Sequence, residues 1–267
     1  MKTTTIRHLF LLPALLLLLA PGVAFAWGAA GHDAIVAIAE ANLTPAARAN
    51  IEKYTGGHSI VYYASWMDHV RHTNKYRRST KWHTAPVDSH YYYTSDVANE
   101  QDGDAITAIE ESMRALRNYK KLSAEAVEYH IKILVHAIGD YHCPVHVKYL
   151  NIRTAFNVTI NGRETTYHSV WDGAVVTNRQ WGYLEWVHQM NRLPRDQIAK
   201  ITSGTPRDWF HQTALDSRVI YTWVKPNQKL EGNVLRDFLN KATPLAESQI
   251  QKAGYRLAAV FNYFFAE

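Results

Sequence analysis

Two histidine–aspartate pairs constrain this chain more than any other feature of its sequence. His136 and Asp140 are four residues apart, and His168 and Asp172 repeat that spacing further along the chain. Residues four apart lie on the same side of an α-helix, so each pair places an imidazole beside a carboxylate, where together they can chelate one ion. A single pair of this kind is most often a surface helix pair of little energetic worth. The repetition indicates helices that present ligands.

Apolar residues recur with helical spacing through most of the chain. We expect helices over 31–43, 60–72, 105–120, 124–140, 169–186, 206–223 and 235–265. A further helix begins at Thr44-Pro45, a cap followed by proline at the first helical position, and stops at Gly56-Gly57. Residues 156–160 and 163–167 flank Asn161-Gly162 and predict a tight β-hairpin. The sequence therefore predicts an all-α fold, a mainly helical single domain with one small hairpin.

The first 26 residues predict a signal peptide. Lys2 and Arg7 precede an apolar run over 9–20, and Ala24-Phe25-Ala26 has the small-x-small pattern of a cleavage site. The run is too short for an ordinary spanning helix, although a membrane anchor is the alternative, and no later segment has 18 uninterrupted apolar residues. We expect an exported protein, periplasmic or secreted, with one domain over 27–267 that begins at Trp27.

Composition narrows the partners only slightly. The formal net charge is +5, and loss of Lys2 and Arg7 with the signal peptide leaves +3. This mild basicity suits an anionic substrate without identifying one. Cys143 is the one cysteine, so no intramolecular disulfide can form, and an exported domain must then be stabilised by its core or by metal.

Further histidines and an aspartate accompany the two pairs. His146 follows the first pair beyond a proline, and His32, Asp68 and His83 lie upstream in apolar or aromatic surroundings. Each of these residues alone is more often structural than a ligand. Together with the pairs they indicate nitrogen and oxygen ligands for several zinc ions, with no thiolate required.

The order of these motifs resembles the three-zinc single-strand nucleases, also acting as 3′-nucleotidases, of fungi, plants and bacteria. The residues that carry the resemblance are Trp27-Gly28 with His32 five residues after Trp27, Ala-Ser-Trp-Met-Asp ending at Asp68, Trp82-His83, the run from His136 to His146, and His168-Ser-Val-Trp-Asp172. Weaker similarity continues to residues 253–258. The family lies in the same superfamily as zinc-dependent phospholipase C.

The resemblance implies three Zn²⁺ sites. One zinc would be held by Asp68, His83, His136 and Asp140. A second would be held by the α-amino nitrogen and carbonyl oxygen of Trp27, by His32, and by Asp140, which bridges these two sites. The third would be held by His146, His168 and Asp172, with positions left open for water or substrate.

The resemblance also implies a reaction. Single-stranded DNA or RNA would be hydrolysed to 5′-phosphorylated products by a hydroxide between the two zincs that share Asp140, oriented by Asp68, while Arg71 stabilises phosphoryl charge. Nucleotides would also be substrates. The family tends to place an aromatic residue and an asparagine where this chain has Thr84 and Gly173. Both departures affect the base pocket, so base preference stays open. We expect a monomer without stable membrane association.

Two other functions remain open. An exported zinc phospholipase C would share the helices, the N-terminal tryptophan and three zincs. The short spacing from Trp27 to His32 and the aspartate at position 172 favour the nuclease instead. A non-catalytic module that binds zinc or nucleic acid would hold metal without turnover. Cys143 lies inside the ligand-rich run, where it is either a zinc ligand or, as we expect, an unligated neighbour.

Overall fold

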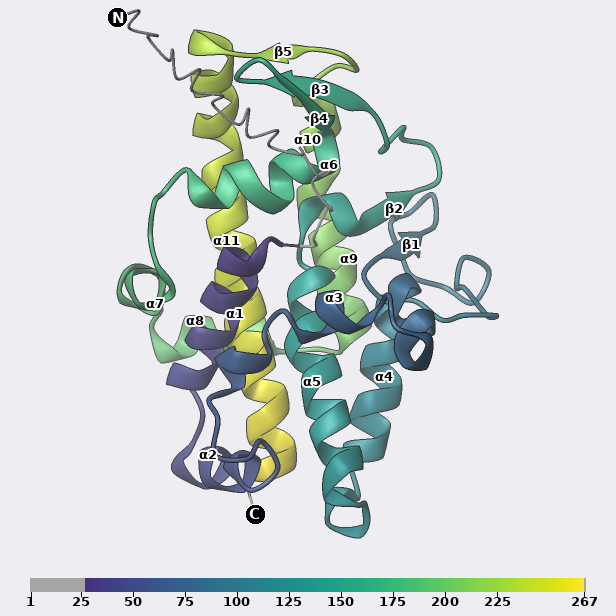
Figure 1. The fold of residues 1–267 in the computed structure, drawn as a ribbon, viewed down its shortest axis with the longest axis vertical. Coiled ribbons are helices and arrows are strands. Elements are labelled where there is room, and N and C mark those ends of the chain that lie inside the picture. The colour runs from purple at the N-terminus through teal and green to yellow at the C-terminus, as the bar shows by residue number, and fades with distance from the viewer. Residues whose placement is uncertain (1–26, 267) are drawn as a thin grey trace, which may run out of the picture.

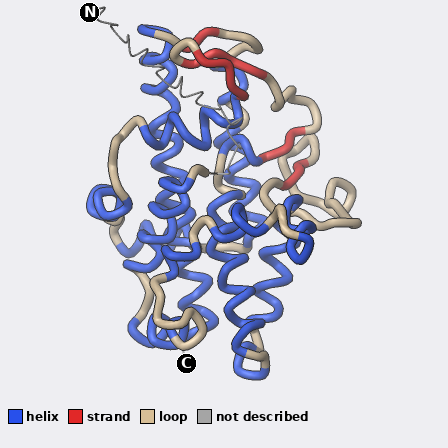
Figure 2. Tube along the Cα trace, in the orientation of Figure 1, coloured by secondary structure: helices blue, strands red, loops and turns tan. Residues whose placement is uncertain are grey.

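A computed structural model describes residues 27–266, so the predicted signal peptide over 1–26 lies outside the described residues. The described part is mainly helical, which confirms the predicted fold class (Figure 2). None of its helices is both long enough and apolar enough to cross a membrane.

The α-helices vary widely in length. They are α1 (Ala29–Ala41), α2 (Pro45–Glu52), α3 (Trp66–Val70), α4 (Ala105–Leu116), α5 (Ala124–Asp140), α6 (Tyr167–Ser169), α7 (Tyr183–Met190), α8 (Arg195–Thr202), α9 (Pro206–Ser217), α10 (Ile220–Trp223) and α11 (Gly232–Phe265). Short 3₁₀ segments are η1 (Ile60–Tyr63), η2 (Asn74–Lys81), η3 (Tyr119–Lys121) and η4 (Pro144–His146), and η5 (Val170–Val175) is a π-helix.

The long helix α11 organises the molecule. It runs the length of the fold, with α1 packed along it, while α4 and α5 form a neighbouring pair (Figure 1). The helix α1 separates two groups of buried apolar side chains. Its Val36 and Ala39 belong to one group, with α4 and α5, and its Ile35 and Ile38 belong to the other, with Trp27 and residues of η5.

The predicted hairpin is present. Strand β3 (Asn157–Ile160) pairs antiparallel with β4 (Arg163–Thr166), and Asn161 and Gly162 in the turn have positive φ, as such a turn requires. A short strand β5 (Lys229–Leu230) extends this sheet in parallel with β3, and β1 (Ala85–Val87) pairs in parallel with β2 (Val147–Tyr149). Neither addition was predicted, because strands of two or three residues carry no periodic signal.

Three predicted helices are interrupted. The helix predicted over 60–72 divides into η1 and α3 near Ser65, whose backbone is not helical. The helix predicted over 169–186 is broken before α7, near Gln180, which adopts a left-handed conformation. The helix predicted over 206–223 divides into α9 and α10, because residues 218–219 form a turn. The helix predicted to stop at Gly56-Gly57 ends earlier, at Glu52. The helix predicted over 105–120 continues beyond α4 only as the 3₁₀ segment η3. Helix α8 was not predicted because it has no buried residue, and so no apolar stripe.

We expect Asp104 to be a strong determinant of stability. Its buried carboxylate caps α4 by accepting the amides of Ile106 and Thr107, and it also accepts the hydroxyl of Tyr93. Asp104→Ala leaves these donors unpaired and should lower the free energy of unfolding by about 2 to 3 kcal/mol, measured by urea denaturation. Ser123→Ala, which removes the exposed cap of α5, should cost only about 1 kcal/mol. Equal losses would contradict this account.

Candidate metal centre

Most of the predicted ligands lie in one buried cluster. His32 comes from the first turn of α1, Asp68 from α3, and His83 from the loop just before β1. His136 and Asp140 come from the last turns of α5, which spans the residues predicted for it, 124–140. Each of these side chains is at most 5% exposed. Segments far apart in the sequence therefore bring their polar side chains to one interior point.

Asp140 is the centre of this cluster. Its Oδ2 lies 2.8 Å from His83 Nδ1 and 3.2 Å from His136 Nε2. Its Oδ1 lies 3.2 Å from His32 Nε2 and 3.6 Å from His146 Nδ1. One carboxylate thus faces four imidazoles.

Asp68 faces the same cluster from α3. Its Oδ1 is 3.7 Å from His83 Nδ1, and its Oδ2 is 3.9 Å from His136 Nε2. Arg71 Nη1 lies 3.5 Å from Asp68 Oδ1, so the guanidinium predicted to act on phosphate stands at the edge of the cluster.

A second cluster adjoins the first. His168 Nε2 lies 3.1 Å from Asp172 Oδ2, and His146 Nε2 lies 3.7 Å from Asp172 Oδ1. The rings of His146 and His168 are stacked, with centroids 4.9 Å apart. His168 is about one-third exposed, whereas His146 and Asp172 are buried. His146 therefore stands between the two aspartates, and His168 forms the open rim.

Asp172 lies in the π-helix η5, and His168 in the preceding turn α6. The sequence predicts that this pair lies on one regular α-helix. In the structure the pair instead spans the short turn α6 and the π-helix η5. Isolated π-helical turns are often found at functional sites, where the wider turn re-aims a side chain.

The start of the described chain reaches this second cluster. The amide of Gly28 donates to the carbonyl of Asp172 over 2.6 Å, and a Cβ on Gly28 would lie only 2.7 Å from that oxygen. Only glycine permits so close an approach. The side chain of Trp27 is fully buried and folds against Gly31, so the predicted N-terminal residue adjoins the centre.

Burial and neighbouring charges shift the pKa values of the cluster in both directions. Burial lowers the pKa of His32 and of His83. Burial would raise the pKa of Asp140, but the imidazoles of His136 and His146 outweigh it and hold this pKa well below its usual range. The carboxylates in turn raise the pKa of His136 and of His146, against the effect of burial. The shifts at His32, His83 and Asp140 favour the neutral imidazoles and ionised carboxylate that metal binding requires, whereas the ligands His136 and His146 must give up any proton they hold when metal binds.

The donors fit metal ions. Within residues 27–266, three groups of donor atoms lie close enough to share an ion: His32 with Asp68 and His136, His83 with His136 and Asp140, and Cys143 with His146 and Asp172. Several buried donor atoms there have no hydrogen-bond partner, namely both ring nitrogens of His32 and of His146, Nε2 of His83, and one oxygen each of Asp68, Asp140 and Asp172. Buried donors left unpartnered are costly unless a bound ion satisfies them, and imidazole with carboxylate suits zinc.

A backbone contact orients one of these imidazoles. His136 Nδ1 lies 2.8 Å from the carbonyl oxygen of Ala64. Because a carbonyl can only accept, Nδ1 carries a proton, and this contact directs Nε2 toward the cluster. Such a contact is the usual support of a histidine that binds metal.

Cys143 touches the second cluster. Its buried Sγ lies 3.6 Å from Asp172 Oδ1, and burial, reinforced by the charge of Asp172, raises the thiol pKa well above its ordinary value. In this contact the thiol of Cys143 donates to Asp172 and helps to hold its carboxylate in place.

A cavity of about 630 Å³ opens beside His168. Thr84 lines it, and no atom lies within 4 Å of where a side chain on Gly173 would begin. Lys148 and Arg153 also line the cavity and were not predicted. Their position in the sequence could have indicated them, because both follow the candidate ligand His146 within a few residues.

Comparison with known proteins defines the class. The S1/P1 nuclease family matches residues 27–266, and the chain belongs to this family. Nuclease P1 of Penicillium citrinum is 30% identical over 264 residues, which cover 88% of this chain and 97% of that one. Nuclease S1 of Aspergillus oryzae is 25% identical, covering 88% and 90%, and endonuclease 4 of Arabidopsis thaliana is 25% identical, covering 91% and 90%.

We expect Gly139→Ala to damage the centre without weakening its helix. The new Cβ would lie 2.9 Å from His32 Nδ1 and would displace that ring, although alanine favours helix more than glycine does. Zinc affinity should fall about tenfold or more, measured by metal content after dialysis. Gly173→Ala, which meets no atom within 4 Å, should keep its zinc. Full zinc in the Gly139 variant would refute the assignment of His32.

Proposed function

We propose that this protein is a zinc-dependent endonuclease that hydrolyses phosphodiester bonds of single-stranded DNA and RNA to 5′-phosphorylated products and also acts as a 3′-nucleotidase. The observation that carries the proposal is the buried cluster of imidazole and carboxylate donors around Asp140, in a chain that belongs to the S1/P1 nuclease family. The names of the relatives agree with nuclease activity.

Three zinc ions would occupy the centre. Asp68, His83, His136 and Asp140 would hold one, and His146, His168 and Asp172 another. Trp27 and His32 would hold the third together with Asp140. The contacts of His83 and His136 with Asp140 Oδ2, and of His32 with Asp140 Oδ1, support this division. So do the contacts of His146 and His168 with Asp172.

Bound zinc would supply Lewis acidity and a water molecule of lowered pKa. The chain's own residues would do the rest. Asp68, whose Oδ1 has no hydrogen-bond partner, is placed to accept a hydrogen bond from the attacking water. Arg71, anchored 3.5 Å from that oxygen, is placed to donate to a phosphoryl oxygen as negative charge develops. Substrate would reach the centre past His168 and Thr84, and Gly173 would leave room for a base.

In this proposal the protein is exported, its signal peptide is cleaved before Trp27, and the mature enzyme is a monomer. A free α-amine at Trp27 can bind zinc, whereas the amide formed by any preceding residue cannot donate in the same way. Cleavage of the signal peptide would therefore complete the site.

The deciding measurement is zinc content and cleavage on one sample of protein beginning at Trp27. We expect about three zincs per chain and cutting of single-stranded DNA and RNA that a chelator abolishes and added zinc restores. Zinc without cutting, combined with hydrolysis of lecithin, would favour a phospholipase C. Zinc without either activity would favour a binding module, and absence of zinc would overturn the proposal.

We expect one extra alanine before Trp27 to inactivate the enzyme. Because this residue blocks the α-amine, the variant should hold about one zinc fewer per chain and cleave DNA about 100-fold more slowly or worse. The control carries the extra alanine after Glu267 and should match the unmodified protein. The hypothesis fails if both variants have full zinc and full activity.

A further inference from the structure

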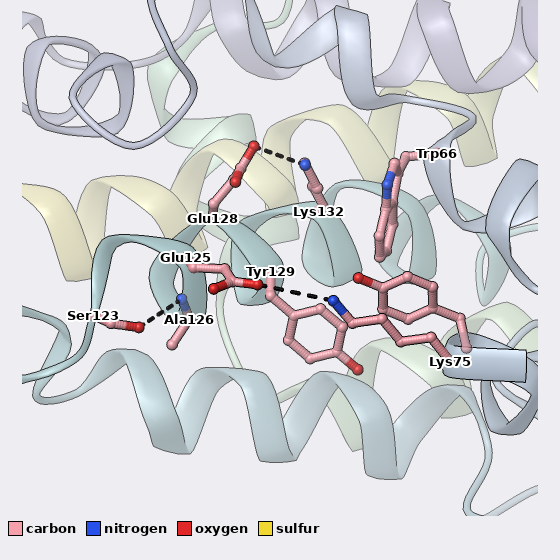
Figure 3. Close-up of a pocket in the computed structure, with 9 residues that line it drawn as sticks. Trp66, Lys75, Ser123, Glu125, Ala126, Glu128, Tyr129 and Lys132 are labelled. Carbon is pink, nitrogen blue, oxygen red and sulfur yellow. Dashed lines mark hydrogen bonds and ion pairs between the residues drawn. The ribbon is translucent and has the colours of Figure 1, made fainter.

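A second cavity, of about 500 Å³, lies between α3, η2 and α5 (Figure 3). It is separate from the residues assigned to the metal centre, and three aromatic side chains line it: Trp66, Tyr76 and Tyr129. None of the three is fully buried. Aromatic faces that remain accessible in a concave site are ready surfaces for stacking.

The three rings form a corner. Those of Tyr76 and Tyr129 are nearly parallel, with an interplanar angle of 19° and centroids 6.1 Å apart. Trp66 stands almost perpendicular to both, at 74° and 85°. In Figure 3 the ring of Tyr129 is seen face-on and that of Trp66 edge-on. A flat aromatic ligand can stack on the tyrosines while its edge rests against the indole.

Two lysines border the corner. Lys132 Nζ lies 5.4 Å from the centre of the Trp66 ring and pairs with Glu128 at 2.7 Å, while Lys75 pairs with Glu125 at 3.8 Å (Figure 3). Both partners of the Lys75 pair are largely exposed, and such pairs contribute little. Lys75 Nζ also lies 5.1 Å from the centre of the Tyr76 ring. A phosphate can therefore replace Glu125 beside Lys75 at little cost. Glu125 and Glu128 are each paired with a lysine, so the cavity does not favour a cationic ligand.

A basic strip joins this corner to the metal centre. No acidic residue occurs between Asp68 and Asp88, whereas the same stretch carries Arg71, Lys75, Arg77, Arg78 and Lys81. The 3₁₀ segment η2 holds four of these cations in eight residues. A polyanion that contacts Arg71 at the centre would thus find favourable charge along η2 as far as Tyr76.

Helix α5 sets the distance. Tyr129, Lys132 and His136 are spaced three and four residues apart and so share one face of the helix. Seven residues separate Tyr129 from His136, which is about 10 Å along the axis. Stacked nucleotides advance about 3.4 Å each, so roughly three nucleotides span this interval.

We propose that the Trp66–Tyr76–Tyr129 corner is a remote subsite that stacks an unpaired base of a single-stranded nucleic acid, with Lys75 on an adjoining phosphate. The inference rests on the proposed function for its substrate class. It adds that substrates a few nucleotides long or longer bind more tightly than a dinucleotide, because only they reach the corner.

The test compares Tyr129→Ala with the unmodified zinc-loaded enzyme on a ten-nucleotide oligothymidylate and on a dinucleotide. We expect KM for the ten-mer to rise about 5- to 100-fold with kcat unchanged, as for loss of one stacked base. Cleavage of the dinucleotide should not change. Tyr129→Phe keeps the ring and should restore KM, and Tyr263→Ala removes a tyrosine that is 76% exposed on α11 and should have no effect.

Binding without cleavage separates the subsite from the reaction. Fluorescence anisotropy with a phosphorothioate ten-mer should show the same weakening in Tyr129→Ala. If the enzyme cuts DNA but the variant changes neither KM nor binding, the subsite is wrong and the proposed function stands. If no DNA is cut but binding still depends on Tyr129, the subsite stands and the proposed function fails. An equal loss on the dinucleotide would show that Tyr129 is merely structural and would overturn the subsite.

Charge variants test the ligand class. Lys75→Ala should reduce the slope of log Kd against log salt concentration by about 0.7, the value for one phosphate contact on a single strand. Glu125→Gln removes the competing carboxylate and should tighten binding of the ten-mer. Weaker binding in Glu125→Gln, or an unchanged salt slope in Lys75→Ala, would contradict a phosphate on Lys75.

Discussion

The fold depends on one buried carboxylate, that of Asp140. Moving an isolated carboxylate into a protein interior costs several kcal/mol, so it persists only where other groups compensate its charge. Here four imidazoles, those of His32, His83, His136 and His146, lie within 3.6 Å of its oxygens. The charges of His136 and His146 lower the pKa of Asp140 in spite of its burial. The contact of α1 with α5 and the position of the segment before β1 are therefore tied to the same point.

The elements that the sequence predicts well are those with strong local signals. Helix α5 has a serine cap, a long apolar stripe and a proline soon after its end, and its predicted bounds agree with the structure. The hairpin follows from Asn161-Gly162, whose conformation few other residues adopt. Tertiary contacts determine the remainder. Strands β1 and β2 exist only because the segments that follow His83 and His146 meet at the centre, and no local pattern announces a pair three residues long.

The residues of the candidate site also divide into those that local sequence patterns predict and those that only tertiary structure brings together. The pair spacing places His136 beside Asp140 and His168 beside Asp172, whatever the fold, because four residues make one helical turn or nearly so. No spacing rule brings His32 or His83 to Asp140, since these residues come from other elements. Only the resemblance assigned them, and the structure shows them within 3.2 Å of that carboxylate. The π-helical turn under Asp172 and the contact of Cys143 with it lie beyond any sequence pattern.

The distribution of charge follows from this arrangement. The carboxylates of Asp68, Asp140 and Asp172 are buried. Two of the connections that begin and end at ligands carry several cations, namely η2 between Asp68 and His83, and the segment with Lys148 and Arg153 between His146 and His168. Each of these two segments begins and ends at a candidate ligand, so the positions of the ligands constrain where its cations lie. Buried negative charge surrounded by exposed positive charge lets the surface attract a polyanion while the interior retains metal.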